Sequence, residues 1–207
     1  MLAISKFDFT QNANQASIST HNNRQQSHLI KTHSQPKRDT ANFKGLPANF
    51  KVVIPNKLFI GIRPSVKEIN ALENKGIKSV VDVCNSSDET TISEETSKIE
   101  EIKKIEALGI EYVPGILNRG SNRDFVGQLE GLANNIDTQM KKGPVFIYCE
   151  NGERCTVAAV VAYQHFIQKM PDSEILKYAQ KSNNEALTQA LLFSIKSAVK
   201  DYTKKKT

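Results

Sequence analysis

From Phe50 onward, short apolar runs alternate with longer stretches in which apolar residues recur every three to four positions. Short runs rich in β-branched and aromatic residues predict strands, and the longer period predicts amphipathic helices. Their alternation predicts an α/β fold with a central, mostly parallel sheet flanked by helices. The runs expected to form strands are Lys51–Pro55, Lys57–Ile60, Ile77–Cys84, Ile110–Pro114 and Pro144–Cys149.

Capping residues mark the helices between these strands. Ser65 offers an N-cap, and Gly76, Gly109 and Gly143 stand where a helix is expected to end. The run PVFIYC is typical of a buried strand, and a strongly apolar helix follows it after a short turn. The expected helices are 65–72, 94–108, 123–142, 156–169, 173–181 and 184–200.

Residues 1–45 show neither period. They are rich in Asn, Gln, Ser, Thr and His and hold too few apolar residues to offset the entropy of ordering, so we expect a disordered polar tail. The histidines within this tail, His21, His28 and His33, fit no compact metal site. The ordered domain is expected over residues 46–200, followed by a basic tail over residues 201–207.

The net charge of +6 lies mostly at the two ends of the chain. Residues 1–45 hold six Lys and Arg against two Asp, and residues 196–207 hold five Lys against one Asp. The stretch between them is slightly acidic, so a basic face that reads nucleic acid is not expected on the domain.

Only three cysteines occur, which argues against a disulfide framework and favours a reducing compartment. The first residues, MLAISKFDFT, lack the apolar run of a signal peptide, and no stretch approaches the ~18 apolar residues that span a bilayer. We therefore expect a soluble, cytoplasmic protein without a transmembrane segment, while export as an effector and the oligomeric state stay open.

The chemistry is predicted to lie in the segment that follows PVFIY, namely CENGERCT. A turn between a buried strand and a helix directs backbone N–H groups into one small space, where the helix dipole adds partial positive charge. Cys149 in such a field is expected to have a depressed pKa and to act as a thiolate nucleophile. Gly152 lets the backbone curl without a Cβ, and Arg154 offers a planar fork to oxyanion oxygens. The other candidate phosphate-binding residues of this loop are Glu150, Asn151, Glu153, Cys155 and Thr156.

Both cysteines of this segment also have a structural interpretation. Cys149 could be an inert buried thiol at a strand end, although Gly152, Arg154 and the helix start all favour the anion site. Cys155, at the helix start, is typical of a small packing residue rather than of a second nucleophile.

Three runs resemble the protein-tyrosine and dual-specificity phosphatase superfamily: KLFIGIRPSVKEINALENKGIKSVVDVC, LGIEYVPGI and GPVFIYCENGERC. The chain is most similar to the bacterial branch of β-lactamase-hydrolase-like, phosphatase-like domains, over about residues 53–180. The resemblance implies a helix-flanked sheet with the cysteine loop at its C-terminal edge. It also implies hydrolysis of a phosphomonoester through a phosphocysteine intermediate, with no cofactor and no metal. The implied partner is a phosphorylated protein or small molecule.

The loop departs from the family pattern HCxxGxxR[ST]. Tyr148 stands where histidine is usual, Cys155 occupies the sixth position after the nucleophile, and Arg154 comes one residue early. The resulting C-x4-R spacing is similar to that of rhodaneses, whose loop CxxGxR[ST] carries a persulfide. Glu150 and Glu153 add carboxylates beside the anion site, which repel an anionic ligand and tend to raise a thiol pKa. Two alternatives therefore stay open: a sulfurtransferase that works through a cysteine persulfide, and a catalytically inactive module that binds phosphate or a partner.

The general acid and a redox partner are the last candidates. In phosphatases of this type an aspartate on the loop after the YVP-like strand protonates the leaving oxygen, and here that loop reads GILNRGSNRD. Asn118, near the expected place, cannot act as an acid, so Asp124 is the candidate, with an N-terminal helix charge as the alternative. Cys84 ends a neighbouring strand and is the candidate redox partner of Cys149, provided that their Cα atoms lie within about 7 Å.

Overall fold

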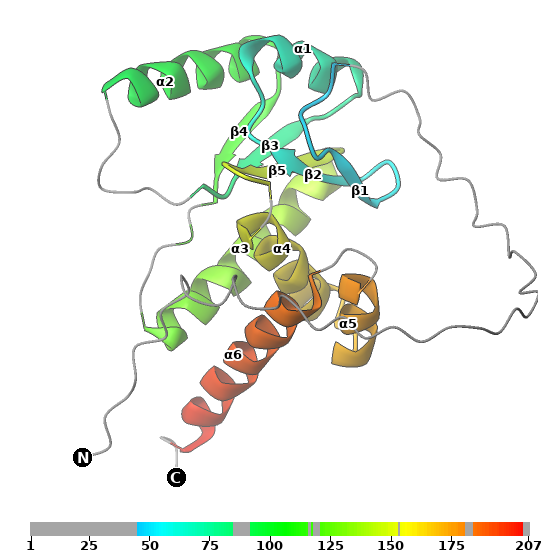
Figure 1. Ribbon diagram of the computed structural model, residues 1–207, viewed down its shortest axis with the longest axis vertical. Helices are drawn as coiled ribbons and strands as arrows, with labels where there is room; N and C mark the ends of the chain where they lie inside the picture. Colours follow the sequence, from blue (N-terminus) through cyan, green and yellow to red (C-terminus); the bar gives the residue numbers. More distant parts are fainter. Residues whose placement is uncertain are drawn as a thin grey trace, which may run out of the picture. The chain divides into compact units, whose positions relative to one another are not determined.

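The computed structural model of the chain groups Thr40–Thr207 in one compact unit, and Figure 1 shows its elements. Residues 1–44 of the predicted polar tail, residues 205–207 of the predicted basic tail, Asn118 and Glu153 lie outside the residues that the structure describes. No helix among the described residues is long and apolar enough to cross a membrane. The described residues are 45–84, 92–115, 117, 121–152, 154–180 and 184–204.

A five-stranded sheet with the order β1-β2-β5-β3-β4 forms the centre of this unit. The pair β1–β2 is antiparallel, whereas the pairs β2–β5, β5–β3 and β3–β4 are parallel, so the sheet is mostly parallel, as predicted. β5 is buried at all five positions, which explains why its sequence is a continuous apolar run. The strands are β1 (Lys51–Ile54), β2 (Leu58–Ile62), β3 (Ser79–Asp82), β4 (Glu111–Pro114) and β5 (Val145–Cys149).

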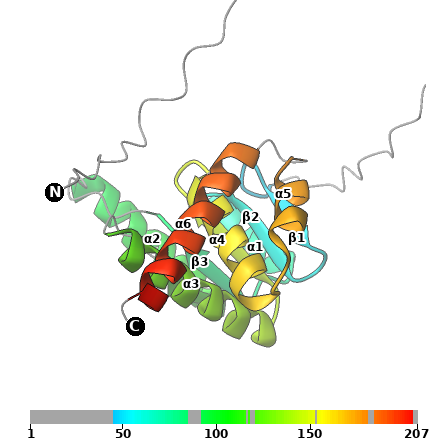
Figure 2. The same ribbon diagram turned by 90° about the horizontal axis from the view of Figure 1, so that it is seen from below.

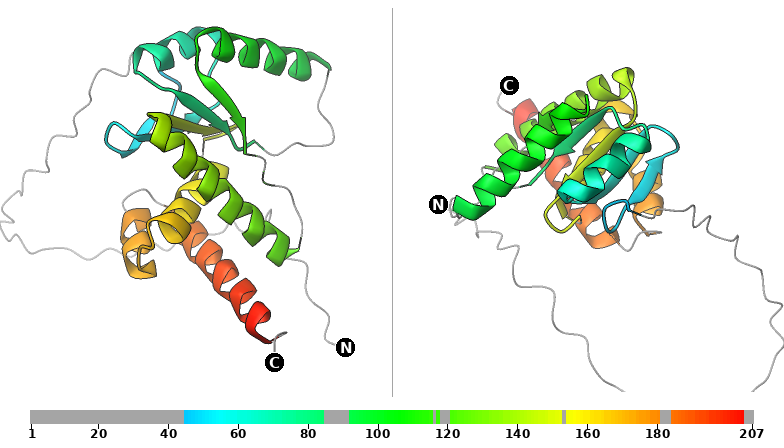
Figure 3. Two further views of the ribbon diagram at one scale, coloured as in Figure 1. Left: turned by 180° about the vertical axis from the view of Figure 1, so that it is seen from behind. Right: turned by 90° about the horizontal axis from the view of Figure 1, so that it is seen from above.

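One face of the sheet is covered by α1 (Val66–Asn74) and α2 (Ile92–Ala107), as Figure 3 shows. A core of buried residues lies beneath these helices, with Ile69 from α1 and Ile105 from α2. Within this core the ring of Phe50 stacks against Phe59 at 5.3 Å and against Phe146 at 5.6 Å between centroids. Stacked aromatic rings therefore join the segment before β1 to the two strands β2 and β5.

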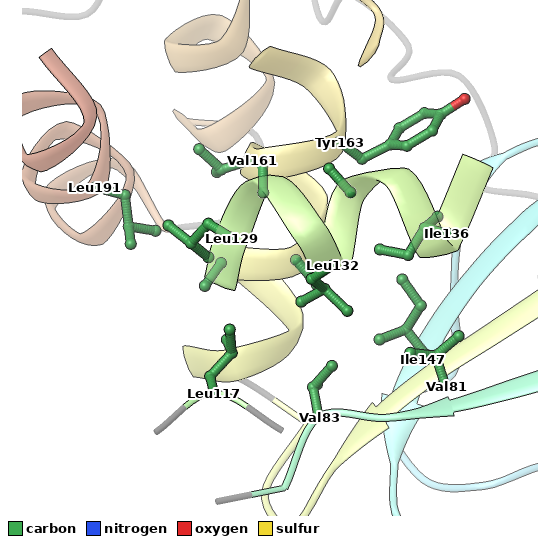
Figure 4. Packing of buried hydrophobic residues seen from close by; sticks show 14 of the residues in the cluster. Val81, Val83, Leu117, Leu129, Leu132, Ile136, Ile147, Val161, Tyr163 and Leu191 are labelled. Atoms are coloured by element: carbon green, nitrogen blue, oxygen red, sulfur yellow. The ribbon is translucent and has the colours of Figure 1, made fainter. Parts of the chain in front are cut away.

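The opposite face carries the larger core and most of the remaining helices (Figures 1 and 2). Figure 4 shows how the long helix α3 fills this core: Ile136 lies toward Val81 and Ile147 of the sheet, and Leu129 lies toward Val161. The helices on this side of the sheet are α3 (Asn122–Lys142), α4 (Arg154–Ala162), α5 (Asp172–Gln180) and α6 (Glu185–Lys204).

Two helix boundaries illustrate how the sequence sets these elements. Ser65 precedes α1, and the Glu68 carboxylate accepts hydrogen bonds from both the backbone N–H and the hydroxyl of Ser65, at 2.7 Å each. The helix predicted over 156–169 instead begins at Arg154 and changes at Tyr163 into η1 (Tyr163–Ile167), a π-helical segment. Periodicity alone cannot predict this change, because a π turn adds one residue without altering the apolar character of the run.

Candidate functional site

The cysteine loop emerges at the edge of the sheet where the parallel strands end. Ile62 of β2 pairs with Cys149 of β5, and Asp82 of β3 pairs with Tyr148. Asp82 is also paired with Pro114, the last residue of β4. The C-terminal ends of four strands therefore meet here, which is the edge where open α/β sheets bind ligands.

Cys149 is followed by a tight turn that holds the loop against β2. The backbone N–H of Gly152 donates to the carbonyl of Cys149 at 3.1 Å, and the N–H of Arg63 donates to the same carbonyl at 3.1 Å. Gly152 has a φ of +64°, and a Cβ at this position would lie 2.7 Å from Ile62 Cγ2 and 2.9 Å from the carbonyl carbon of Gly61. Both the conformation and the contact require glycine, as the sequence predicted.

The helix α4 begins immediately after this turn, at Arg154. The first N–H groups of a helix have no partner within the helix, and the helix dipole places partial positive charge beside them. Within this first turn Arg154 is exposed, Cys155 is partly buried and Thr156 is fully buried. The turn after Cys149 therefore leads into a helix start that can supply N–H donors and that begins with a cation, Arg154, and Cys149 itself is 5% exposed.

Cys155, six positions after Cys149, interacts directly with it. A hydrogen bond to Cys149, together with burial and the electrostatic interaction with Cys149, raises the pKa of the Cys155 thiol well above its usual range. Cys155 therefore stays protonated at neutral pH and donates its S–H to the sulfur of Cys149. The side chain that replaces the expected arginine is a weak donor to the candidate nucleophile.

Cys84 has a different environment beside the same loop. Burial, a hydrogen bond to Asp82 and the charge of Asp82 raise the pKa of the Cys84 thiol above its usual range. Its sulfur also lies 3.9 Å from a carboxylate oxygen of Glu150. None of the three cysteines forms a disulfide in the structure, so the pairing of Cys84 with Cys149 stays a prediction.

Glu150 does not stand alone beside the anion site. Its side chain is 66% exposed and lies 3.7 Å from the guanidinium of Arg63, which offsets part of its charge. The Nη2 atom of Arg63 is buried and has no hydrogen-bond partner among the described residues. Arg63 was not identified from the sequence, yet it places a guanidinium at the edge of the cysteine loop.

Asp124, the candidate general acid, lies in the first turn of α3 and is exposed. The Ser121 hydroxyl donates to its carboxylate at 2.5 Å, and the backbone N–H of Asp124 donates to the Ser121 hydroxyl at 3.2 Å. This reciprocal arrangement is that of an N-terminal cap. The Asp124 carboxylate therefore takes part in the cap of α3.

A buried polar cluster under the loop was missed by the sequence analysis. Glu101 of α2 is 3% exposed; it accepts a hydrogen bond from the Tyr148 hydroxyl at 2.6 Å and from the Arg63 Nε at 2.6 Å. Burial raises the pKa of Glu101, although the hydrogen bonds from Tyr148 and Arg63 oppose this. The sequence holds one signal for the burial of Glu101. Ile105 lies four residues later, so the two side chains share one face of α2, and Ile105 is buried although most residues of this helix are polar or charged.

A second buried carboxylate, Asp82, closes the same edge of the sheet. It accepts hydrogen bonds from the Tyr112 hydroxyl at 2.7 Å and the Cys84 N–H at 2.9 Å, and it lies 3.0 Å from the Lys98 ammonium. Burial opposes its charge, but these hydrogen bonds prevail and lower the pKa of Asp82 below 3.8. The stability that Asp82 contributes is therefore present above that pH and is lost as the pH falls through its folded-state pKa.

Replacing Glu101 with glutamine is expected to lower the free energy of unfolding by roughly 2–4 kcal/mol, because an amide cannot accept from both Arg63 and Tyr148. Thermal or urea unfolding of the purified chain measures this. Glu100→Gln is the matched control, since Glu100 lies on the exposed side of the same helix and its loss should change stability by less than about 0.5 kcal/mol. Equal losses in the two variants would mean that the buried cluster does not stabilise the loop.

Comparison with known proteins identifies the class of fold. Neither a family model nor a curated protein matches the sequence. Tk-PTP in its active form aligns with a TM-score of 0.53 at 14% identity, over 72% of this chain and 96% of that chain. The core catalytic domain of the PP-IP phosphatase SIW14 from S. cerevisiae, solved with citrate, aligns with a TM-score of 0.51 at 15% identity, over 78% of this chain and 94% of that chain. A DUF442 phosphatase structure from Shewanella putrefaciens CN-32 aligns with a TM-score of 0.50 at 20% identity, over 75% of this chain and 93% of that chain.

These likenesses define the class of protein by its fold. The described domain has the fold of these protein-tyrosine-phosphatase-like structures, and in this chain the central parallel strand β5 ends at Cys149. The α/β architecture and the superfamily resemblance predicted from the sequence are therefore confirmed at the level of the fold.

Proposed function

We propose that the chain hydrolyses a phosphomonoester, with Cys149 as the nucleophile. The observation that carries this proposal is the position of Cys149: it ends the central strand β5, lies beside the first turn of α4, and accepts a hydrogen bond from the Cys155 thiol. A negative charge on sulfur is stabilised at such a place, because the helix start and the thiol both present positive dipoles to it. The fold of cysteine-based phosphatases supports the same chemistry.

The proposed reaction has two displacements. The Cys149 sulfur attacks phosphorus, the bond between phosphorus and the leaving oxygen breaks, and the leaving oxygen takes a proton from Asp124. Water then attacks the phosphocysteine and gives a proton to the Asp124 carboxylate, the bond between phosphorus and sulfur breaks, and phosphate leaves while the thiolate is restored. Arg154 and the N–H groups at the start of α4 are proposed to stabilise the charge on the equatorial oxygens.

The proposed substrate is a phosphorylated protein or a small phosphorylated molecule. Arg154 at the mouth of the loop and Arg63 beside Glu150 provide positive charge for such a ligand. A phosphotyrosine, a phosphoinositide and a small phosphorylated metabolite all present the same dianionic group to this site. Aryl phosphates are therefore suitable first substrates for a test.

The proposal is tested by alkylating the full-length chain with iodoacetamide while following hydrolysis of p-nitrophenyl phosphate. We expect inactivation, carboxamidomethylation of Cys149 ahead of Cys84 and Cys155, and protection of Cys149 by inorganic phosphate. The raised pKa values of the other two thiols are the physical reason for this order. Inactivation that tracks modification of Cys84 or Cys155 instead, or hydrolysis that persists after Cys149 is fully alkylated, would contradict it.

The same protein separates the proposal from its rivals. Incubation with thiosulfate and cyanide yields thiocyanate if a persulfide forms on Cys149, and thiocyanate without phosphate release would support sulfur transfer. Phosphate binding without either product would support a module that binds without turnover.

The role of Asp124 is tested by comparing substrates that differ in leaving group. If Asp124 protonates the leaving oxygen, Asp124→Asn should lower hydrolysis of phenyl phosphate by about 10²-fold and that of p-nitrophenyl phosphate much less, because p-nitrophenolate leaves without a proton. Ser121→Ala is the matched control: it removes the cap at a cost of about 1 kcal/mol in stability and leaves the carboxylate in place. Identical effects of the two substitutions on both substrates would leave Asp124 with the capping role alone.

A further inference from the structure

A cavity of about 280 Å³ opens on the face of the sheet that α4, α5 and α6 cover, and its lining on α4 begins at Val157, after the cysteine loop. Residues of β1, β2, α4, η1, α5 and α6 line it, and Figure 2 shows α4, α5 and α6 on this side of β1 and β2. No described residue of the loop from Cys149 to Thr156 lines the cavity, so it is a separate site. Its apolar wall includes Ile60, Val157, Val160, Val161, Ile175 and Ala179.

The polar residues Lys51, Asn184, Gln164 and Thr188 also line the cavity, and the last two are buried. Gln164 is 5% exposed and Thr188 is 0% exposed, and both line the cavity. Neither Oε1 of Gln164 nor Oγ1 of Thr188 has a hydrogen-bond partner among the described residues. Buried polar atoms are nearly always hydrogen-bonded, so two orphaned oxygens in the wall of one cavity indicate that a molecule in the cavity satisfies them.

The two oxygens come from different elements: Gln164 belongs to the π-helical segment η1, and Thr188 belongs to α6. The N–H of Gln168 donates to the carbonyl of Tyr163, five residues earlier, at 3.1 Å, which is the π-helical pattern. Within this segment the consecutive residues Tyr163 and Gln164 are both buried, the first in the main core and the second in the cavity wall. Thr188 lies in the first turn of α6, where its backbone N–H donates to the carbonyl of Asn184 at 3.0 Å.

We propose that this cavity binds a small, mainly apolar molecule that carries a hydroxyl group, such as a phenol or a short alcohol. The carbonyl oxygen of Gln164 accepts hydrogen bonds only, so the ligand group that meets it must donate, whereas the threonine hydroxyl can donate or accept. A hydroxyl satisfies both requirements, because it donates one hydrogen bond and accepts another. The apolar wall accounts for the rest of the ligand, and the volume matches one ring or a short chain rather than a larger cofactor.

The hydroxyl is what distinguishes this proposal from simple filling of an apolar hole, and p-cresol and toluene test it because they share a shape and differ in that group. In the full-length chain with labelled Ile, Leu and Val methyl groups, p-cresol is expected to shift the NMR signals of Ile60, Val160 and Ile175 saturably. Toluene is expected to bind at least about tenfold more weakly, which corresponds to about 1.4 kcal/mol.

Two variants make the result specific. Thr188→Val keeps the shape of the side chain and is expected to weaken p-cresol binding to near the level of toluene while leaving toluene binding unchanged. Ala179→Phe fills the cavity and is expected to abolish the shifts from both compounds. Equal affinities for p-cresol and toluene, shifts that persist in Ala179→Phe, or an ordered water that bonds to both oxygens and that p-cresol does not displace would each overturn the proposal. Unchanged thermal unfolding of Thr188→Val shows that a loss of binding does not reflect unfolding.

Discussion

Replacing Cys149 with serine is expected to lower the hydrolysis of p-nitrophenyl phosphate by roughly 10³–10⁶-fold, since loss of a nucleophile removes the covalent step entirely. A serine hydroxyl at the end of β5 would keep the backbone of the loop, because the contacts of residue 149 with Gly152 and Arg63 pass through its main-chain carbonyl. It would not ionise near neutral pH. The initial rates of nitrophenol release by the purified natural chain and by Cys149→Ser measure this loss of activity.

Cys84→Ser is the matched control for this prediction. Cys84 is a thiol at the same edge of the sheet, with a raised pKa and a hydrogen bond to Asp82, so it lies near the site but is held in its protonated form. We expect the control to retain activity within about threefold, in line with a residue that makes no bond to the reacting atoms. A loss of similar size in both variants would mean that the serine substitutions act through the loop structure and not through the nucleophile.

Replacing Cys155 with arginine is expected to raise aryl phosphate hydrolysis by about 10²–10³-fold. Residue 155 faces the sulfur of Cys149 and now offers only a weak S–H donor. A guanidinium at this position would place two N–H groups beside the equatorial oxygens and stabilise the charge that develops on them. The gain should appear mainly in kcat, because the interaction strengthens as the transition state forms.

Cys155→Leu controls for the size of the new side chain. It fills the same place without a donor, so it is expected to leave the rate at or below that of the natural chain. If Cys155→Arg shows no gain while both variants unfold at the temperature of the natural chain, the prediction is wrong, and the guanidinium of Arg154 already meets the need of the site. In that case Arg154→Ala in the natural chain should lose activity, which identifies the source.

The order of elements was predictable because the periodicity, the caps and the turn residues of this chain agree with one another. Ser65, Gly76, Gly109 and Gly143 lie at helix boundaries, and the strand PVFIYC is buried throughout. β3, expected over Ile77–Cys84, is shorter in the structure because its pairing ends at Asp82, whose side chain turns to the polar cluster. α6 extends to Lys204, beyond the expected Lys200, since nothing in its polar end disfavours a helix.

The site was only partly readable from the sequence, for a physical reason. Cys149, Gly152 and the start of α4 come from one continuous segment, so their spacing predicts their proximity. Arg63 and Glu101 lie 38 residues apart in the chain and meet only through the tertiary fold. No local pattern predicts their contact. In a helix rich in Glu and Lys, a buried glutamate cannot be distinguished by sequence from the exposed ones.

The central claim is that a covalent bond forms between phosphorus and the sulfur of Cys149, and rapid denaturing quench of the chain during turnover of p-nitrophenyl phosphate tests it most directly. Mass spectrometry of the quenched chain is predicted to show one added phosphoryl group, located on the peptide that contains Cys149 and missing in Cys149→Ser. Sustained phosphate release with no phosphoryl group on Cys149 at any time, or a phosphoryl group on another residue, would contradict the account.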